Sequence, residues 1–206
     1  MRISVICPSF LGDYPGAAPN RRQIFVRAVN SFLAQTHKDC ELICISDGCS
    51  ETIQIVKSRY KKELQAKRIV LLELPRHPLF TGAVRQAGID AATGEAVCNL
   101  DGDDYFLPHH LTSINSGFTE NEDWVFFNYW IRPDNIKGVD HLFQSDGTLS
   151  TLNNGSHSWR RSLPVSWEGC DGKGVDNKIF LARLLEFPKR RKIYGTGYVL
   201  TNVQLL

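Results

Sequence analysis

The sequence has 206 residues, of which 42% are hydrophobic and 22% charged, a composition that excludes a disordered or fibrous chain and suits one globular domain. The 24 Lys and Arg against 22 Asp and Glu give a net charge of +2, which is too balanced to indicate a nucleic-acid-binding protein. No apolar run approaches the ~20 residues of a membrane-spanning helix.

The first half of the chain alternates short apolar runs with amphipathic segments. In chain order we expect a strand at 3–7, a helix after Asn20, a strand at 42–45, a helix from Ser50, a strand at 69–74, a helix at 82–92, a strand at 96–100, a helix near Pro108 and a strand from Val125. Strands that are apolar throughout and separated by helices predict an α/β fold whose mostly parallel central sheet has helices on both faces.

Ligands of such sheets bind at the carboxyl ends of the strands, so the polar residues after each strand are the candidate site. These are residues 8–9, 46–48 and 101–104. In the second half, residues 145–174 are rich in Gly, Ser, Asn and Asp, which predicts loops over the carboxyl edge of the sheet. One helix, 176–187, is expected after them.

The most informative feature is the run Asp-Gly-Asp-Asp at 101–104, directly after an apolar strand. Clustered carboxylates repel one another unless a cation or hydrogen-bond donors compensate. Mg²⁺ and Mn²⁺ prefer oxygen ligands and often need only one or two protein carboxylates when phosphate supplies the rest. A metal-bound diphosphate is therefore one interpretation, and a solvated acidic turn that caps the next helix is the other.

Several segments in order resemble the opening of family 2 glycosyltransferases. They are residues 4–10 (SVICPSF), 28–36 (AVNSFLAQT), 41–50 (ELICISDGCS), 82–89 (GAVRQAGI), 92–95 (ATGE) and 99–104 (NLDGDD). The resemblance implies the GT-A nucleotide-binding fold as a single domain over 1–206. In that domain, residues 1–107 would bind the nucleotide sugar and residues 108–206 would form the acceptor side.

The resemblance also implies roles for single residues. Those expected to bind the nucleotide sugar are Pro8, Ser9, Phe10, Asp47, Arg85, Asp101, Gly102 and Asp103. Asp103 and Asp101 match the Asp-x-Asp motif and are the expected ligands of Mn²⁺ or Mg²⁺. Taken without the resemblance, the favoured interpretations are that Asp47 forms an Asx-type turn with Gly48 and that Arg85 is an exposed helix residue.

Family members have an acidic residue that acts as the base at the start of a helix after a Gly-rich loop, and Asp176 matches it. Its alternative role is that of a first-turn residue that stabilises the helix. Val175 replaces the glutamate that usually precedes it. His157, Trp159 and Arg160 resemble the segment before this helix and are expected to line the acceptor pocket or to serve the fold.

The implied activity is transfer of a sugar from a nucleotide-diphosphate donor, expected to be a UDP-sugar, to a glycan or lipid-linked hydroxyl acceptor, with inversion and metal assistance. We expect a soluble cytoplasmic protein, at most peripheral to the inner face of a membrane. Two alternatives stay open. One is a phosphatase of the haloacid dehalogenase type with Asp101 as nucleophile, and the other is a non-catalytic relative that only binds nucleotide or glycan.

Overall fold

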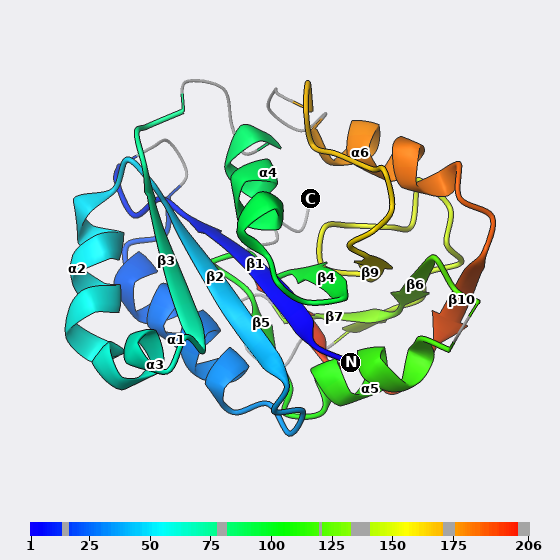
Figure 1. The fold of residues 1–206 in the computed structure, drawn as a ribbon, viewed down its shortest axis with the longest axis horizontal. Coiled ribbons are helices and arrows are strands. Elements are labelled where there is room, and N and C mark those ends of the chain that lie inside the picture. The colour runs from blue at the N-terminus through cyan, green and yellow to red at the C-terminus, as the bar shows by residue number, and fades with distance from the viewer. Residues whose placement is uncertain (14–16, 78–81, 120, 133–140, 171–175, 202–206) are drawn as a thin grey trace.

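The computed structural model describes all residues except 14–16, 78–81, 120, 133–140, 171–175 and 202–206 (Figure 1). Its centre is a seven-stranded sheet. In spatial order the strands are β10 (Arg190–Ile193), β6 (Trp124–Phe127), β9 (His157–Arg160), β4 (Ala96–Asn99), β1 (Ile3–Ser9), β2 (Cys40–Asp47) and β3 (Ile69–Leu74). The predicted α/β fold with a mostly parallel sheet is confirmed.

Strand β9 is the exception to the parallel arrangement. It lies between β4 and β6 and runs antiparallel to both, with Val97 and Trp124 each opposite Trp159. The prediction of loops over 145–174 is therefore wrong at this strand. Four residues among Ser, Asn and Gly resemble a loop locally, and only pairing with two distant strands makes them part of the sheet.

Helices cover both faces of the sheet. On one face lie α1 (Arg21–Leu33), α2 (Ser50–Arg59), α3 (Lys61–Gln65) and α5 (His110–Gly117), and on the other lie α4 (Gly82–Ala91) and α6 (Asp176–Leu185). Figure 1 shows α4 in front of the sheet and α1 behind it. None of the helices in the described part of the chain has both the length and the apolar character that a membrane crossing requires.

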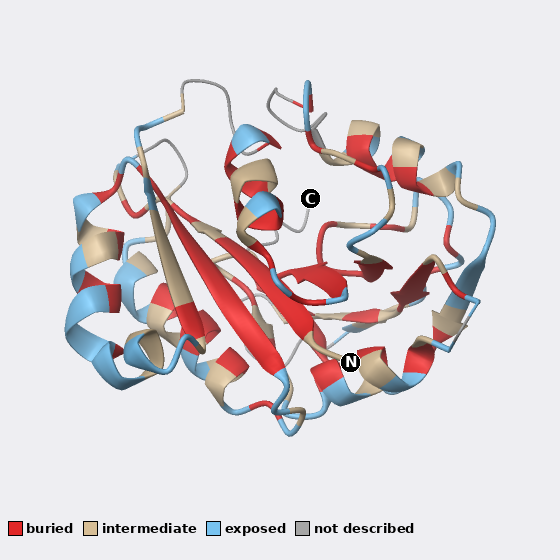
Figure 2. Ribbon diagram, viewed as in Figure 1, coloured by how far each residue is buried: buried red, intermediate tan, exposed pale blue. Residues whose placement is uncertain are grey.

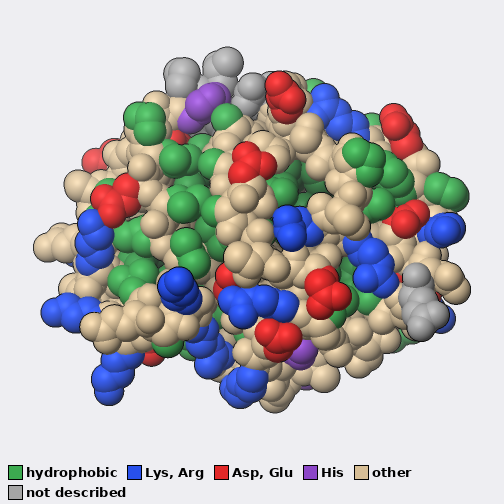
Figure 3. Space-filling model, in the orientation of Figure 1, with side chains coloured by type: hydrophobic (Ala, Val, Ile, Leu, Met, Phe, Trp, Pro, Cys, Tyr) green, Lys and Arg blue, Asp and Glu red, His purple; other side chains and the backbone are tan. Residues whose placement is uncertain are grey.

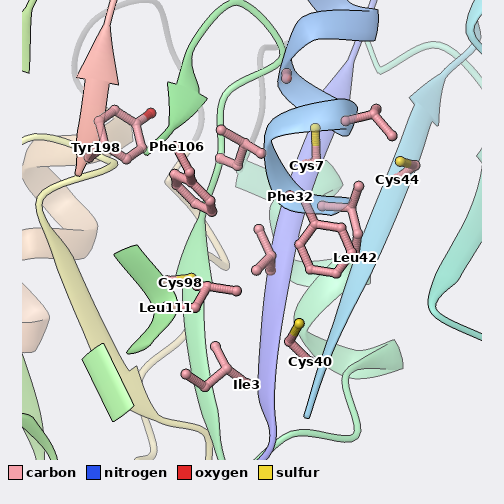
Figure 4. Packing of buried hydrophobic residues seen from close by; sticks show 14 of the residues in the cluster. Ile3, Cys7, Phe32, Cys40, Leu42, Cys44, Cys98, Phe106, Leu111 and Tyr198 are labelled. Carbon is pink, nitrogen blue, oxygen red and sulfur yellow. The ribbon is translucent and has the colours of Figure 1, made fainter. Parts of the chain in front are cut away.

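The central strands are buried on both faces, as Figure 2 shows for β1 and β2. Because successive side chains alternate, Leu42 packs against the α1 side and Ile43 against the α4 side. Figure 4 shows the first of these cores, with Phe32 of α1 beside Leu42. The side chains of the edge strand β3 are less buried than those of the central strands. Figure 3 shows hydrophobic side chains gathered over β2 and β3.

A second, four-stranded sheet completes the fold. Its order is β5 (Tyr105–Phe106), β11 (Tyr198–Leu200), β7 (Tyr129–Ile131) and β8 (His141–Phe143). β5 follows the acidic run 101–104 directly, and β11 pairs with it antiparallel, with Tyr198 opposite Phe106. The far end of the chain is therefore brought against the acidic run.

Candidate functional site

The carboxyl ends of β1, β2, β3 and β4 meet at one edge of the large sheet, because these four strands run parallel. β1 ends at Ser9, β2 ends at Asp47, and β4 is followed by Asp101. Ser9 is buried, and its hydroxyl lies 3.0 Å from the hydroxyl of Thr52 on α2. Polar residues that are far apart in the sequence are thus gathered in one place.

Asp47 is the centre of a cluster at the end of β2 and is 5% exposed. Its carboxylate accepts hydrogen bonds from the Arg76 guanidinium and, at 2.6 Å, from the backbone N–H of His77. The same guanidinium lies 3.7 Å from the ring centroid of Phe10. Gly48 has a φ of +62°, and a Cβ there would collide with the Arg76 backbone, so this turn requires glycine. An aromatic face beside hydrogen-bonding groups can bind a nucleobase.

Residues 101–104 form a turn between β4 and β5, closed by a hydrogen bond from the Asp104 N–H to the Asp101 carbonyl oxygen (2.9 Å). Asp101 and Asp103 are half-buried, whereas Asp104 is buried. A Cβ at Gly102 would lie 3.2 Å from the carbonyl oxygen of Pro8, so the turn packs closely on the end of β1. We call residues 101–104 the acidic turn.

Arg85 of α4 is buried, and its guanidinium donates to Asp101 Oδ1 at 2.8 Å. The side-chain amide of Asn154 donates to the other oxygen of this carboxylate at 3.4 Å. The Arg85 guanidinium also lies 5.2 Å from the ring centroid of Trp167. A buried guanidinium beside the Asp101 carboxylate offsets part of the negative charge of the acidic turn, and guanidinium is a group that binds phosphate well.

Among the described residues, the Asp104 carboxyl group is hydrogen-bonded by Tyr198 of β11 and by Thr201, the residue directly after this strand. Burial and the nearby charges of Asp103 and Asp101 raise the pKa of its carboxyl well above the usual range. The Tyr198 hydroxyl and the Thr201 backbone N–H donate to the two carboxyl oxygens at 2.6 and 2.9 Å, and these bonds act in the opposite direction. Burial also raises the pKa of Tyr198, so its hydroxyl keeps its proton and remains a donor.

The acidic turn contains the type of ligand that hard divalent cations prefer. Within the described residues no three His, Cys, Asp or Glu side chains form a metal-binding group, so this part of the chain does not offer a closed cage. Asp101 and Asp103 instead present two half-buried carboxylates. This hard-oxygen donor set suits Mg²⁺ or Mn²⁺ when phosphate oxygens supply further ligands.

The structure separates the three residues expected on the acceptor side. His157 and Trp159 are buried in the core beneath α6, with ring centroids 5.4 Å apart, and burial lowers the pKa of His157 to about 4. Arg160 lies at the opposite edge of the sheet, where it donates to the backbone carbonyl oxygens of Glu122 and Thr119. It is not brought to the carboxyl edge.

Asp176, the expected base, is the first residue of α6. Its side chain lies outside the described residues, as do Val175 and the Gly-rich segment before it. Its role stays a prediction.

Four residues of the site escaped the sequence analysis: Arg76, Asn154, Tyr198 and Thr201. Arg76 follows the strand 69–74, so the rule that polar residues after parallel strands form the site could have found it. The other three reach the acidic turn from segments far along the chain, and their local sequence has no signal for this contact.

With this geometry established, comparison with known proteins decides the family. The model of "Glycosyl transferase family 2" matches residues 17–162, which is more than half of the chain. The chain belongs to glycosyl transferase family 2. For this family 2 chain, the alternative of a phosphatase of the haloacid dehalogenase type has no support.

Curated relatives of this family 2 chain are longer proteins. An uncharacterized glycosyltransferase of Nostoc sp. is 32% identical over 151 residues, which are 73% of this chain and 43% of that protein. The "GalNAc(5)-diNAcBac-PP-undecaprenol beta-1,3-glucosyltransferase" of Campylobacter jejuni is 28% identical over 134 residues, 65% of this chain and 40% of its own length. The chain thus spans less than half of each of these relatives.

Solved structures show that the family 2 chain has the fold of GT-A glycosyltransferases. Residues 1–349 of S. aureus TarS in complex with UDP superpose with a TM-score of 0.74 at 20% identity, over 98% of this chain and 60% of that fragment. The mannosyltransferase PcManGT of Pyrobaculum calidifontis, in complex with GDP-Man and Mn²⁺, superposes with a TM-score of 0.66 at 14% identity, over 97% of this chain and 56% of that protein.

Proposed function

We propose that this chain transfers a sugar from a nucleotide-diphosphate donor to a hydroxyl acceptor. The observation that supports it best is the convergence of the Asp47 cluster, the buried Arg85 and the acidic turn on one edge of the sheet in a family 2 chain. Similar proteins bind such donors: TarS was solved with UDP and with UDP-GlcNAc. A UDP-sugar is therefore the first donor to test.

In this proposal the site divides into two parts. The nucleoside lies against Pro8, Ser9 and the Phe10 ring, with its base near Asp47 and Arg76. The diphosphate lies at the acidic turn. Arg85 orients Asp101 through their hydrogen bond and contributes positive charge to the phosphate end.

Asp103 and Asp101 would hold a divalent cation, Mn²⁺ or Mg²⁺, in the presence of the diphosphate. When bound, such a cation offsets the negative charge that develops on the departing diphosphate. The Mn²⁺ in the PcManGT complex supports this part of the proposal by analogy of fold. The chain's own contribution is the placement of two half-buried carboxylates beside a buried arginine.

The reaction we infer is a single displacement with inversion. The acceptor oxygen forms a bond to the anomeric carbon while the bond from that carbon to the diphosphate oxygen breaks. Asp176 at the start of α6 accepts the proton of the acceptor hydroxyl, and the nucleoside diphosphate leaves. The acceptor is a glycan or a lipid-linked glycan, by analogy with the name of the Campylobacter jejuni relative.

Thermal denaturation with a panel of nucleoside diphosphates tests donor binding. With ligand at about 100 times its dissociation constant, the free energy of unfolding rises by ~2.7 kcal/mol. For a chain of this size the midpoint temperature should rise by roughly 5–10 °C. We expect the rise with one nucleotide, with MnCl₂ present, and a smaller rise in EDTA. The absence of any metal-dependent rise with every nucleotide tested would contradict the proposal.

The substitution Asp176→Asn tests catalysis separately from binding. Asparagine has a similar shape but does not accept the proton, so we expect a loss of turnover of about 10²-fold or more with unchanged affinity for UDP and MnCl₂. Hydrolysis of a panel of nucleotide sugars gives a measure of turnover without a known acceptor. If turnover is the same in Asp176→Asn, the base is elsewhere, and if the unaltered chain has none with any donor and acceptor, a binding-only relative is indicated.

A further inference from the structure

The last described strand, β11, is hydrogen-bonded to the acidic turn, although it lies almost at the other end of the chain. The Tyr198 hydroxyl donates to Asp104 Oδ2 at 2.6 Å, and the Thr201 backbone N–H donates to Asp104 Oδ1 at 2.9 Å. Tyr198, Thr201 and Asp104 are all buried. Both oxygens of the one buried carboxyl group of the acidic turn are therefore held by β11 and by the residue directly after it.

Thr201, directly after β11, also holds the backbone of the turn. The Thr201 hydroxyl donates to the carbonyl oxygen of Asp103, and the Arg27 guanidinium donates to the same oxygen at 2.8 Å and to Thr201 Oγ1 at 2.9 Å. The Asp101 N–H lies 3.5 Å from the Tyr198 hydroxyl. The turn is therefore hydrogen-bonded on either side of Gly102, to Tyr198 of β11 on one side and to Thr201 and Arg27 on the other.

Tyr198 has little room to move. A Cβ built on Gly155 would lie 1.9–2.3 Å from atoms of the Tyr198 ring, so the loop before β9 is in direct contact with this ring. On other sides the ring packs against Phe106, with centroids 5.7 Å apart (Figure 4), and against His110, with centroids 6.1 Å apart. A rigid donor can fix the position of its acceptor better than a mobile one.

We propose that Tyr198 and Thr201 are positioning residues: through Asp104 and the Asp103 carbonyl they hold Asp101 and Asp103 in the arrangement that binds a metal–nucleoside diphosphate. This inference rests on the proposed function. Three neighbouring carboxylates repel one another, and the turn would relax to a wider spacing without these bonds. Groups that orient metal-binding carboxylates typically contribute 10- to 100-fold to metal affinity.

The substitution Tyr198→Phe removes the hydroxyl and keeps the ring that fills the space between Gly155 and Phe106. Calorimetric titration with UDP, once in MnCl₂ and once in EDTA, separates the metal-dependent affinity from the metal-independent affinity. We expect the affinity in MnCl₂ to fall roughly 10- to 100-fold and the affinity in EDTA to stay unchanged. A purely structural role would lower both affinities together or neither.

Tyr60→Phe is the matched control, because it also removes a buried phenol hydroxyl that donates a hydrogen bond, in this case to Asn30 at 3.1 Å. Tyr60 lies at the junction of α2 and α3, away from the acidic turn. The affinity for UDP in MnCl₂ should be unchanged in this variant. Thr201→Val and Thr201→Ser form a second pair: valine should weaken the affinity in MnCl₂, and serine, which keeps the hydroxyl, should restore it.

The outcomes separate the inference from the proposed function. If the unaltered chain binds no nucleoside diphosphate more tightly in MnCl₂ than in EDTA, the proposed function fails. If the unaltered chain shows this difference and Tyr198→Phe keeps it in full, the positioning role is overturned. Should Tyr198→Phe fail to fold, the Thr201 pair decides, and equal affinities of valine and serine variants in MnCl₂ would overturn the role.

Discussion

Arg85 is a buried cation that forms an ion pair with the Asp101 carboxylate. The guanidinium is 4% exposed and the carboxylate 24%, so the pair is screened by water on one side only. Removal of the cation would leave Asp101 beside Asp103 and Asp104 without this ion-pair partner. Breaking a buried ion pair lowers the free energy of unfolding by more than an exposed ion pair contributes to it.

Arg85→Met, which keeps much of the side chain's volume, should lower the free energy of unfolding by about 2 kcal/mol, since one oxygen of Asp101 loses a charged donor. Urea denaturation measures this change. The control is Arg22→Met, which breaks an exposed pair with Glu51 (2.7 Å) and should cost no more than about 0.5 kcal/mol. If the two variants lower the free energy of unfolding equally, the buried Arg85–Asp101 pair stabilises the fold no more than an exposed pair does.

At the scale of elements, one buried carboxylate joins three segments of the chain. These are the start of β1, the start of β2 and the connection from α4 to β4. Glu41 accepts hydrogen bonds from the Ser4 hydroxyl (2.6 Å) and from the N–H and hydroxyl of Thr93 (2.7 and 2.9 Å). Burial alone would raise the pKa of Glu41, but these bonds and one from Arg2 outweigh it and lower the pKa. The segment 92–95 therefore serves the fold, at the edge opposite the site.

Glu41→Gln should lower the free energy of unfolding by about 2 kcal/mol, because the charge-assisted bonds from Ser4 and Thr93 are weakened. The affinity for UDP and MnCl₂ should be unchanged, since Glu41 lies at the amino edge of the sheet. Urea denaturation and calorimetry on one preparation give both values. Glu73→Gln, at an exposed pair with Lys57, should change stability by no more than about 0.5 kcal/mol. A loss of nucleotide affinity in Glu41→Gln would contradict this assignment.

For the molecule as a whole, two histidines are buried in different cores. Burial lowers the pKa of His110 to about 3 and that of His157 to about 4. Both are therefore neutral in the folded protein at pH values where they become charged in the unfolded chain. Protonation then favours the unfolded state, so stability is fully present above the ordinary pKa of 6.5 and declines as the pH falls toward 4.

We expect the free energy of unfolding to fall between pH 6.5 and 5 by up to about 1.4 kcal/mol per pH unit for each of these histidines. Urea denaturation at a series of pH values measures the slope. In His110→Gln the slope should be smaller, because one titrating group is lost. His141→Gln, at an exposed position of β8, should leave it unchanged. If the free energy of unfolding does not change between pH 6.5 and 5, the two buried histidines do not determine the pH dependence of stability.

Much of the fold and part of the site could be predicted from the sequence, because their signals are local. The apolar run 69–74 and the amphipathic segment 82–92 predicted β3 and α4 almost to the residue. Since parallel strands end at one edge, the prediction that Asp47 and Asp101 lie there followed from strand ends alone, and the structure places both at that edge. Arg85 reaches Asp101 because its helix precedes the same strand.

Contacts between segments far apart in the sequence could be identified only from the tertiary structure. β9 is recognisable as a strand only when β4 and β6 are beside it, and this pairing moves Arg160 to the far edge of the sheet. Tyr198 and Asp104 are 94 residues apart, and neither sequence neighbourhood shows that a buried carboxyl will meet a phenol there. The periodicity of apolar residues in the sequence indicates which residues a helix or strand buries. The partner of a buried polar group is determined by how the elements pack.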